Sequence, residues 1–98
     1  MAIKSMLDLQ PYRDAIIALA EEHGANHVRV FGSVARGEAT DASDVDFLVT
    51  FSEQVSLIDR AGLWLDLQDL LECAVDVVDD RAIKPRLKQS ILQDAVVL

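Results

Sequence analysis

The sequence has little cysteine and few aromatic residues: one Cys, one Trp, one Tyr and three Phe. A lone thiol excludes an internal disulfide, and Cys73 falls late in an apolar helical pattern that predicts a packing role rather than a reactive thiol. Hydrophobic residues still make up 51% of the chain, mainly Leu, Ile, Val and Ala. We therefore expect a folded domain with an aliphatic core, because disordered chains lack such residues.

Long apolar runs are also missing, since none approaches the roughly 20 residues of a membrane-spanning helix. Residues 1–10 lack the basic stretch and the long apolar stretch of a signal peptide. A chain of 98 residues has the size of one small domain. We expect residues 1–98 to form a single cytoplasmic domain without a separate substrate-recognition domain.

Basic residues are scarce, with 9 Lys and Arg against 17 Asp and Glu and a net charge of −8. Nucleic-acid affinity comes largely from Lys and Arg that neutralise phosphates, so direct nucleic-acid binding is not expected. An acidic protein can still hold one triphosphate through divalent cations. The carboxylates are therefore the first candidates for functional residues.

Apolar spacing predicts the element order α-β-(short α)-β-α-β-α. The last helix begins near Lys84-Pro85, and the apolar end of the chain, 96–98, is expected to dock on the domain. This order predicts an α+β fold of the α/β type, with a small mixed three-stranded sheet and about four helices. The predicted elements are a helix over 9–23 with Asp8 as N-cap and Gly24 as its end, a strand over 28–31, one or two helical turns over 33–36, a strand over 44–51, a helix over 56–71, a strand over 74–78 and the last helix.

Asp44 and Asp46 begin the second predicted strand, whose two-residue period places both carboxylates on one face. Two such groups repel each other and attract a cation, and oxygen ligands favour Mg²⁺. An isolated Asp-x-Asp in an acidic protein, however, is more typical of a solvated surface pair.

Asp76 interrupts the apolar run 74–78. A carboxylate inside such a strand needs a partner charge, hydrogen bonds or a metal. Beside the second strand, Asp76 would join Asp44 and Asp46 in a set of three acids for one or two ions. The alternative is an exposed Asp at a strand end, which suits Asp79 and Asp80 better.

Gly32 and Ser33 end the first strand. Glycine at a strand-to-helix turn lets backbone N–H groups approach a phosphate, and the Ser33 hydroxyl adds a donor. Alone, this pair is typical of an ordinary helix start. Its spacing from Asp44 and Asp46 indicates instead a phosphate cradle beside a metal pair.

Basic side chains near these motifs leave two interpretations open. Arg36 can reach a phosphate, or it can pair with Glu38 or Asp41 at the surface. Ser43 is expected to shape the loop.

Four basic residues within eight positions are either a solvated helix start or a contact for triphosphate or an acidic partner: Arg81, Lys84, Arg86 and Lys88.

His23 and His27 have no metal-ligand spacing and are expected to be structural. On the helix over 56–71 we expect Trp64 to pack in the core. Off its main apolar stripe lie Ile58, Ala61 and Leu65, a possible second face for a partner subunit.

Two segments carry a family resemblance: FGSVARGE at 31–38 and SDVDFLV at 43–49. They resemble the minimal nucleotidyltransferase family of the polymerase β-like superfamily, small bacterial and archaeal proteins commonly encoded beside a HEPN toxin as its antitoxin. The segments 75–78 and 83–87 extend the resemblance through nearly the whole chain.

The resemblance implies that Gly32 and Ser33 bind the triphosphate of ATP. It implies that Asp44, Asp46 and Asp76 ligate Mg²⁺, with two ions expected, and form the catalytic triad. The implied activity is Mg²⁺-dependent transfer of AMP from ATP to a tyrosine of a cognate HEPN toxin. The alternatives are an antitoxin that acts by binding without catalysis, or nucleotidyl transfer to a small molecule or an RNA end.

Overall fold

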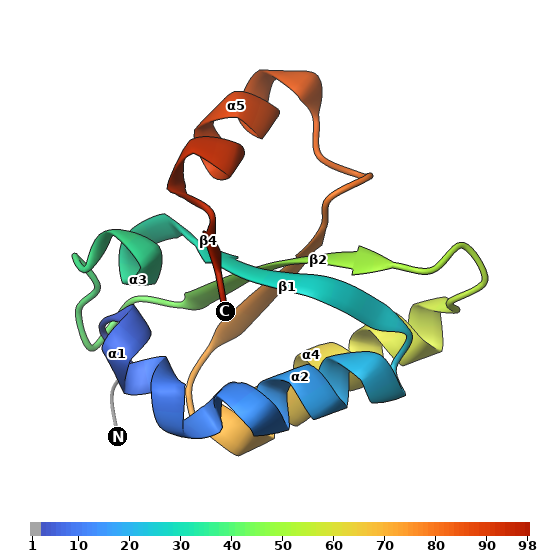
Figure 1. Ribbon diagram of the computed structural model, residues 1–98, viewed down its shortest axis with the longest axis horizontal. Helices are drawn as coiled ribbons and strands as arrows, with labels where there is room; N and C mark the ends of the chain where they lie inside the picture. The colour runs from blue at the N-terminus through green and yellow to red at the C-terminus, as the bar shows by residue number, and fades with distance from the viewer. Residues whose placement is uncertain (1–2) are drawn as a thin grey trace.

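The computed structural model describes residues 3–98, so residues 1 and 2 of the predicted domain 1–98 lie outside the described residues. Ten helical and strand segments build a sheet with helices on both faces (Figure 1). In chain order they are α1 (Met6–Leu9), the 3-10 turn η1 (Gln10–Tyr12), α2 (Arg13–Glu22), β1 (Ala25–Phe31), α3 (Gly32–Arg36), β2 (Val45–Phe51), α4 (Leu57–Leu71), β3 (Val75–Asp79), α5 (Pro85–Asp94) and β4 (Val96–Val97).

The sheet has four strands in the order β3-β2-β1-β4. β1 runs antiparallel to both β2 and β4, whereas β2 and β3 are parallel, so the predicted mixed sheet is confirmed. The predicted number of three strands was one too few. β4 pairs only with Arg29 and Val30, and a strand of two residues is too short to show an alternating pattern.

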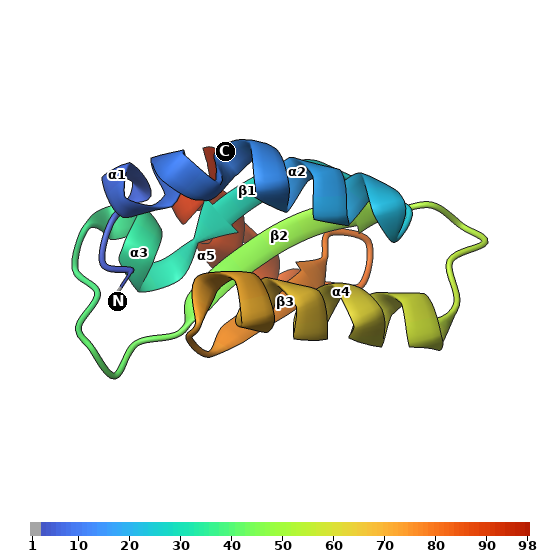
Figure 2. The same ribbon diagram turned by 90° about the horizontal axis from the view of Figure 1, so that it is seen from below.

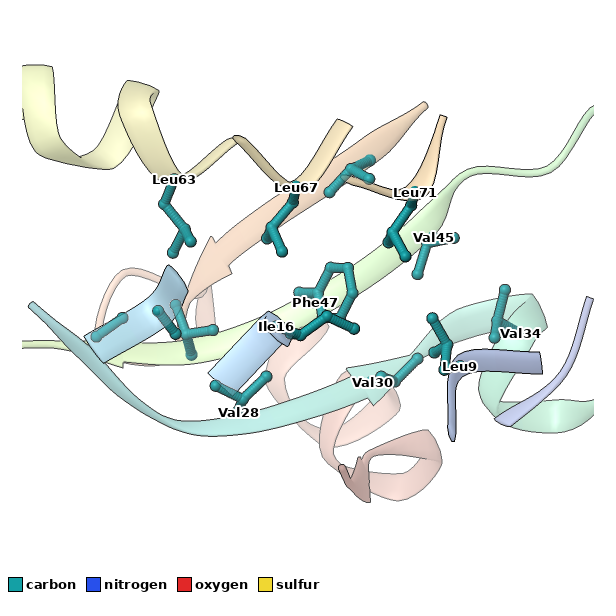
Figure 3. Close-up of a cluster of buried hydrophobic side chains, with 14 of the residues drawn as sticks. Leu9, Ile16, Val28, Val30, Val34, Val45, Phe47, Leu63, Leu67 and Leu71 are labelled. Atoms are coloured by element: carbon teal, nitrogen blue, oxygen red, sulfur yellow. The ribbon is translucent and has the colours of Figure 1, made fainter. Parts of the chain in front are cut away.

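α2 and α4 lie side by side on one face of the sheet, and α5 lies behind the other face (Figure 2). The core fills the space between the sheet and these two helices, with Phe47 of β2 near Ile16 of α2 and Leu67 of α4 (Figure 3). The predicted alternation of β2 is confirmed on this side, because its core-facing residues are all buried: Val45, Phe47, Val49 and Phe51. The other side of β2 carries Asp46, Leu48 and Thr50; Leu48 is buried, but Asp46 and Thr50 toward the two ends of the strand are only partly buried, and we call this side the open face.

The N-terminal helix differs from the prediction of one helix over 9–23. It starts at Met6 and is interrupted by η1, which contains Pro11. Proline has no N–H to donate and therefore breaks the α-helical hydrogen-bond ladder at this point. Asp8 lies inside α1 rather than capping it, and its carboxylate accepts a hydrogen bond from the Lys4 N–H.

α4 begins after Ser56, whose hydroxyl accepts a hydrogen bond from the Asp59 N–H. Its buried side consists of Leu63, Leu67 and Leu71. The prediction that Trp64 packs in the core was wrong: 42% of this residue is exposed, and its Nε1 donates to the Val75 carbonyl at 2.6 Å. Within residues 3–98, no helix is both long and apolar enough to cross a bilayer.

Candidate active site

The open face carries two carboxylates in register on its parallel strands. Asp46 is the second residue of β2 and Asp76 the second residue of β3, and the two are direct partners in the ladder. Partners on adjacent parallel strands point to the same side of a sheet. Asp44, one residue before β2, lies at the same end and is exposed. The fold therefore brings the three predicted acids to one end of the open face.

The end of β1 brings Gly32 to the same place, because Phe31 pairs with Asp46. Gly32 has a φ of +73°, which side chains rarely adopt. A Cβ added to Gly32 would also overlap the Asp46 carboxylate. Sequence analysis predicted the close approach of this glycine to a phosphate but missed its contact with Asp46, which no local pattern reveals.

α3 starts directly at Gly32, with Phe31 in an extended conformation before it and no side chain capping it. The first N–H groups of a helix have no partner within the helix and favour negative charge. Ser33 lies half-buried in this first turn, and Val34 anchors it in the core. The helix ends at Gly37, as predicted, where the Glu38 N–H donates to the Ser33 carbonyl at 2.9 Å.

Arg36 at the end of α3 pairs with two carboxylates. Its Nε lies 3.1 Å from Glu38, as one of the two interpretations predicted, and its Nη1 lies 2.6 Å from Asp94 of α5. These bonds raise the pKa of Arg36 above its usual value. Asp41, the other predicted surface partner, pairs instead with Lys4 at 3.2 Å. A contact between Arg36 and a phosphate stays a prediction.

The acids at this end destabilise each other's charge. Burial, together with the nearby charges of Asp76 and Asp44, raises the pKa of Asp46 to about 6, and only Arg36 acts in the opposite direction. A bound cation would stabilise the ionised form of such a carboxylate, because it offsets the charge of the acidic neighbours. Carboxylate oxygens are ligands that suit Mg²⁺.

Within residues 3–98, no three His, Cys, Asp or Glu side chains converge closely enough to hold an ion without adjustment. Asp44 and Asp76 are exposed, so their side chains are free to turn toward a bound cation. Ligation of Mg²⁺ by Asp44, Asp46 and Asp76 fits the donor chemistry and stays a prediction.

At the other end of β2 and β3, two carboxylates have positively charged partners: Asp80 on the open face and Asp79 on the side that faces α4. The Asp80 carboxylate accepts hydrogen bonds from Arg29 at 2.8 Å and from the Thr50 hydroxyl at 2.6 Å. The Asp79 carboxylate lies 2.8 Å from Arg60 and also accepts the Arg81 N–H. Asp79 and Asp80 lie at the strand end, as predicted, but they are half-buried and paired with arginines rather than exposed to water.

The basic cluster lies at and before α5, and all four of its members are exposed: Arg81, Lys84, Arg86 and Lys88. Arg81 reaches Glu53 at 3.9 Å, and in the described part of the chain the other three make no ion pair. Both predicted roles of this cluster remain open.

The two histidines differ in their surroundings. His23 Nε2 lies 2.7 Å from Asp66, which ties the end of α2 to α4, so the predicted structural role of His23 is confirmed. His27 is exposed and has a positive φ of 51°, where the β1–β2 register shifts.

Comparison with known proteins identifies the family and the fold. Residues 14–98 match the family model described as "Polymerase beta, Nucleotidyltransferase". The chain belongs to this nucleotidyltransferase family. A nucleotidyltransferase acts on a nucleotide, which assigns the chemical class of the substrate.

Three similar proteins support this membership. A solved structure provisionally described as a minimal nucleotidyltransferase is 47% identical, with a TM-score of 0.85 and coverage of 96% of both chains. "Protein adenylyltransferase MntA" from Thermococcus cleftensis is 36% identical over 94% of this chain and 97% of its own. A "toxin-antitoxin with AMP-PNP" crystal structure is 27% identical, with a TM-score of 0.74 and coverage of 86% of this chain and 69% of that one.

Proposed function

We propose that this nucleotidyltransferase is an antitoxin that transfers AMP from ATP to a tyrosine hydroxyl of a HEPN toxin. The observation that carries the proposal is the set of three carboxylates beside Gly32, none of which has a positively charged partner within residues 3–98. The name of the Thermococcus relative supports adenylyl transfer to a protein. The toxin-antitoxin structure with AMP-PNP supports the triphosphate and the type of partner.

In this proposal the triphosphate binds at the start of α3. The N–H groups of Gly32 and Ser33 and the Ser33 hydroxyl donate to its oxygens, and the glycine allows the backbone to approach them. Asp44, Asp46 and Asp76 hold Mg²⁺. When bound, Mg²⁺ supplies positive charge for the attacking hydroxyl and for the departing pyrophosphate.

Asp76 is the acid best placed to act on the acceptor, because it is exposed on β3. It accepts the proton of the tyrosine hydroxyl. The tyrosine oxygen then forms a bond to the α-phosphorus while the bond to the pyrophosphate oxygen breaks. Positioning and charge stabilisation account for most of the rate increase in such reactions.

The test uses the cognate HEPN toxin that this proposal expects to be encoded beside the chain, and we call it the neighbouring HEPN protein. Incubation with this chain, ATP and Mg²⁺ should add AMP units to that protein, as measured by intact mass spectrometry. Tryptic mapping should place them on tyrosine. No mass gain with the wild-type chain would overturn the proposal.

A second candidate is neutralisation of the toxin by binding alone. The exposed apolar residues of α4 favour it, since they provide a contact surface that needs no chemistry. The double variant Asp44→Asn/Asp46→Asn separates the two candidates in a growth-rescue assay. Rescue that survives this substitution, with the complex still forming, would favour binding over catalysis.

A further inference from the structure

One side of α4 is apolar and faces solvent. It consists of five residues, which we call the α4 stripe: Leu57, Ile58, Ala61, Trp64 and Leu65. Leu57 and Ile58 are each 83% exposed, and Leu65 is 52% exposed. The spacing of three and four residues places them along one side of three helical turns. The residues of α4 that pack in the core lie on the other side of the helix, and within the stripe Trp64 donates a hydrogen bond to the sheet, at the Val75 carbonyl.

The α4 stripe continues into a pocket of about 320 Å³ between α4 and β3. Ala61 and Trp64 line the pocket on the helix side, and Asp76 and Val77 line it on the strand side. β3 is an edge strand of the sheet. The Asp76 carboxylate points to the open face, on the other side of the sheet from α4, so the pocket reaches Asp76 around the edge of β3.

The charges near the α4 stripe indicate the kind of partner that would bind there. Of the acidic residues from 57 to 76, Asp59 and Asp66 lie beside His23 rather than at the α4 stripe, and Arg60 is the one basic residue of this segment. Arg60 is already paired with Asp79 at 2.8 Å. Asp69 and Glu72 lie beyond the C-terminal end of the α4 stripe, where both are exposed. A second copy of this chain would bring the same acids into a symmetric contact, so a basic partner fits better.

The edge of β3 is less suited to an added strand. β3 has only five residues, and the Trp64 indole occupies the Val75 carbonyl. A helix avoids this conflict, because its backbone needs no hydrogen bonds from the partner. Apolar positions at helical spacing are also typical of helix-to-helix recognition.

We propose that the α4 stripe and the pocket beside β3 dock a basic amphipathic helix of the protein acceptor and present the acceptor hydroxyl at Asp76. This inference rests on the proposed function for the identity of the acceptor. It adds the surface that recognises the acceptor, which the small nucleotidyltransferase domain would otherwise lack.

The test measures binding of the neighbouring HEPN protein by isothermal titration calorimetry without ATP and Mg²⁺, so that it does not depend on transfer. The variant Ile58→Glu/Leu65→Glu should weaken binding at least about tenfold, because it places charge in the centre of the apolar contact. Leu7→Glu on α1 is the matched control, since Leu7 is 71% exposed and lies outside the α4 stripe. It should bind like the wild type, and circular dichroism should show all variants folded.

A second variant tests the charge of the partner. Asp69→Asn/Glu72→Gln should weaken binding several-fold and reduce its dependence on salt, because fewer opposite charges meet in the complex. Tighter binding by this variant would overturn the assignment of a basic partner. The substitutions lie at exposed positions, so they do not disturb the core.

The remaining outcomes separate this inference from the proposed function. If the wild type transfers AMP and Ile58→Glu/Leu65→Glu binds as tightly as the wild type, the proposed docking surface is wrong but the proposed function stands. Binding that follows the expected pattern without any transfer would overturn the proposed chemistry alone. A wild-type chain that does not bind the neighbouring HEPN protein would overturn both. Self-association of the wild type that Ile58→Glu/Leu65→Glu abolishes would assign the surface to a second copy.

Discussion

The two ends of the open face carry carboxylates in opposite situations. At the start of β2 and β3, burial and the charges of Asp76 and Asp44 together raise the pKa of Asp46 to about 6. At the other end burial also raises the pKa of Asp80, but hydrogen bonds from Thr50 and Arg29 outweigh it and bring the pKa below its usual value. Asp44, Asp46 and Asp76 have no positively charged partner within residues 3–98, whereas Asp80 is paired with Arg29.

This difference separates functional from structural acids on one surface. Asp80 stabilises the fold because Arg29 neutralises it, and on the side that faces α4 Asp79 is neutralised in the same way by Arg60. Asp46 costs stability in the free protein, a cost that a bound cation would remove. Repulsion that is retained in a folded domain is typical of sites that bind or catalyse.

Removal of Asp46, the acid whose charge its neighbours destabilise, should have the largest effect. Asp46→Asn should lower the rate of nucleotidyl transfer by about 10² to 10³-fold, because a carboxylate that holds Mg²⁺ is lost. Single-turnover transfer to the neighbouring HEPN protein measures this rate. Asp80→Asn is the matched control and should transfer at the wild-type rate. An equal loss of transfer rate in both variants would contradict the division into functional and structural acids.

Gly32→Ala should be the next most damaging change. The new Cβ would meet the Asp46 carboxylate at a φ of +73°, so we expect a loss of about 2 to 3 kcal/mol in the free energy of unfolding, together with loss of transfer. Urea denaturation measures the first effect.

Gly37→Ala provides the control for backbone strain. Gly37 has a φ of +72°, but a Cβ there would meet nothing within 4 Å. It should cost only about 1 kcal/mol and leave transfer intact. If the two glycine variants lose equal stability, the contact between Gly32 and Asp46 has no energetic role.

Asp80→Ala should destabilise the fold by about 1 to 3 kcal/mol, because it leaves the half-buried Arg29 and the Thr50 hydroxyl without their acceptor. Chemical denaturation measures this loss. The folded fraction should still bind triphosphate, and a variant as stable as the wild type would show that this pairing does not hold the sheet.

The smallest effect is on the pH dependence of stability. The folded state holds the Asp46 proton up to about pH 6, so the contribution of this group is present below its unfolded pKa of about 3.9 and is lost as the pH rises through about 6. Without Mg²⁺, Asp46→Asn should therefore be the more stable protein above pH 6, by about 1 kcal/mol after allowance for solvent screening. Thermal unfolding at pH 4 and pH 7 measures it, and parallel curves for both proteins would contradict it.

Local patterns were sufficient to predict most of the elements and the convergence of the acids. The alternation of β2 and the proline before α5 are local features, and the fold follows them. Contacts between residues that are far apart in the sequence could not be predicted in this way. Neither the exposure of Trp64, nor the pairing of Arg36 with Asp94, nor the Gly32–Asp46 contact leaves a trace in short-range spacing. The roles of the site residues in binding and catalysis stay predictions.

The most direct test of the central claim is a calorimetric titration of Mg²⁺ and AMP-PNP into three proteins: the wild type, Asp44→Asn/Asp46→Asn and Asp80→Asn. The account predicts Mg²⁺-dependent binding by the wild type and by Asp80→Asn, and none by the double variant. Equal binding by the double variant and the wild type would contradict the assignment of the metal and triphosphate to the start of β2 and β3.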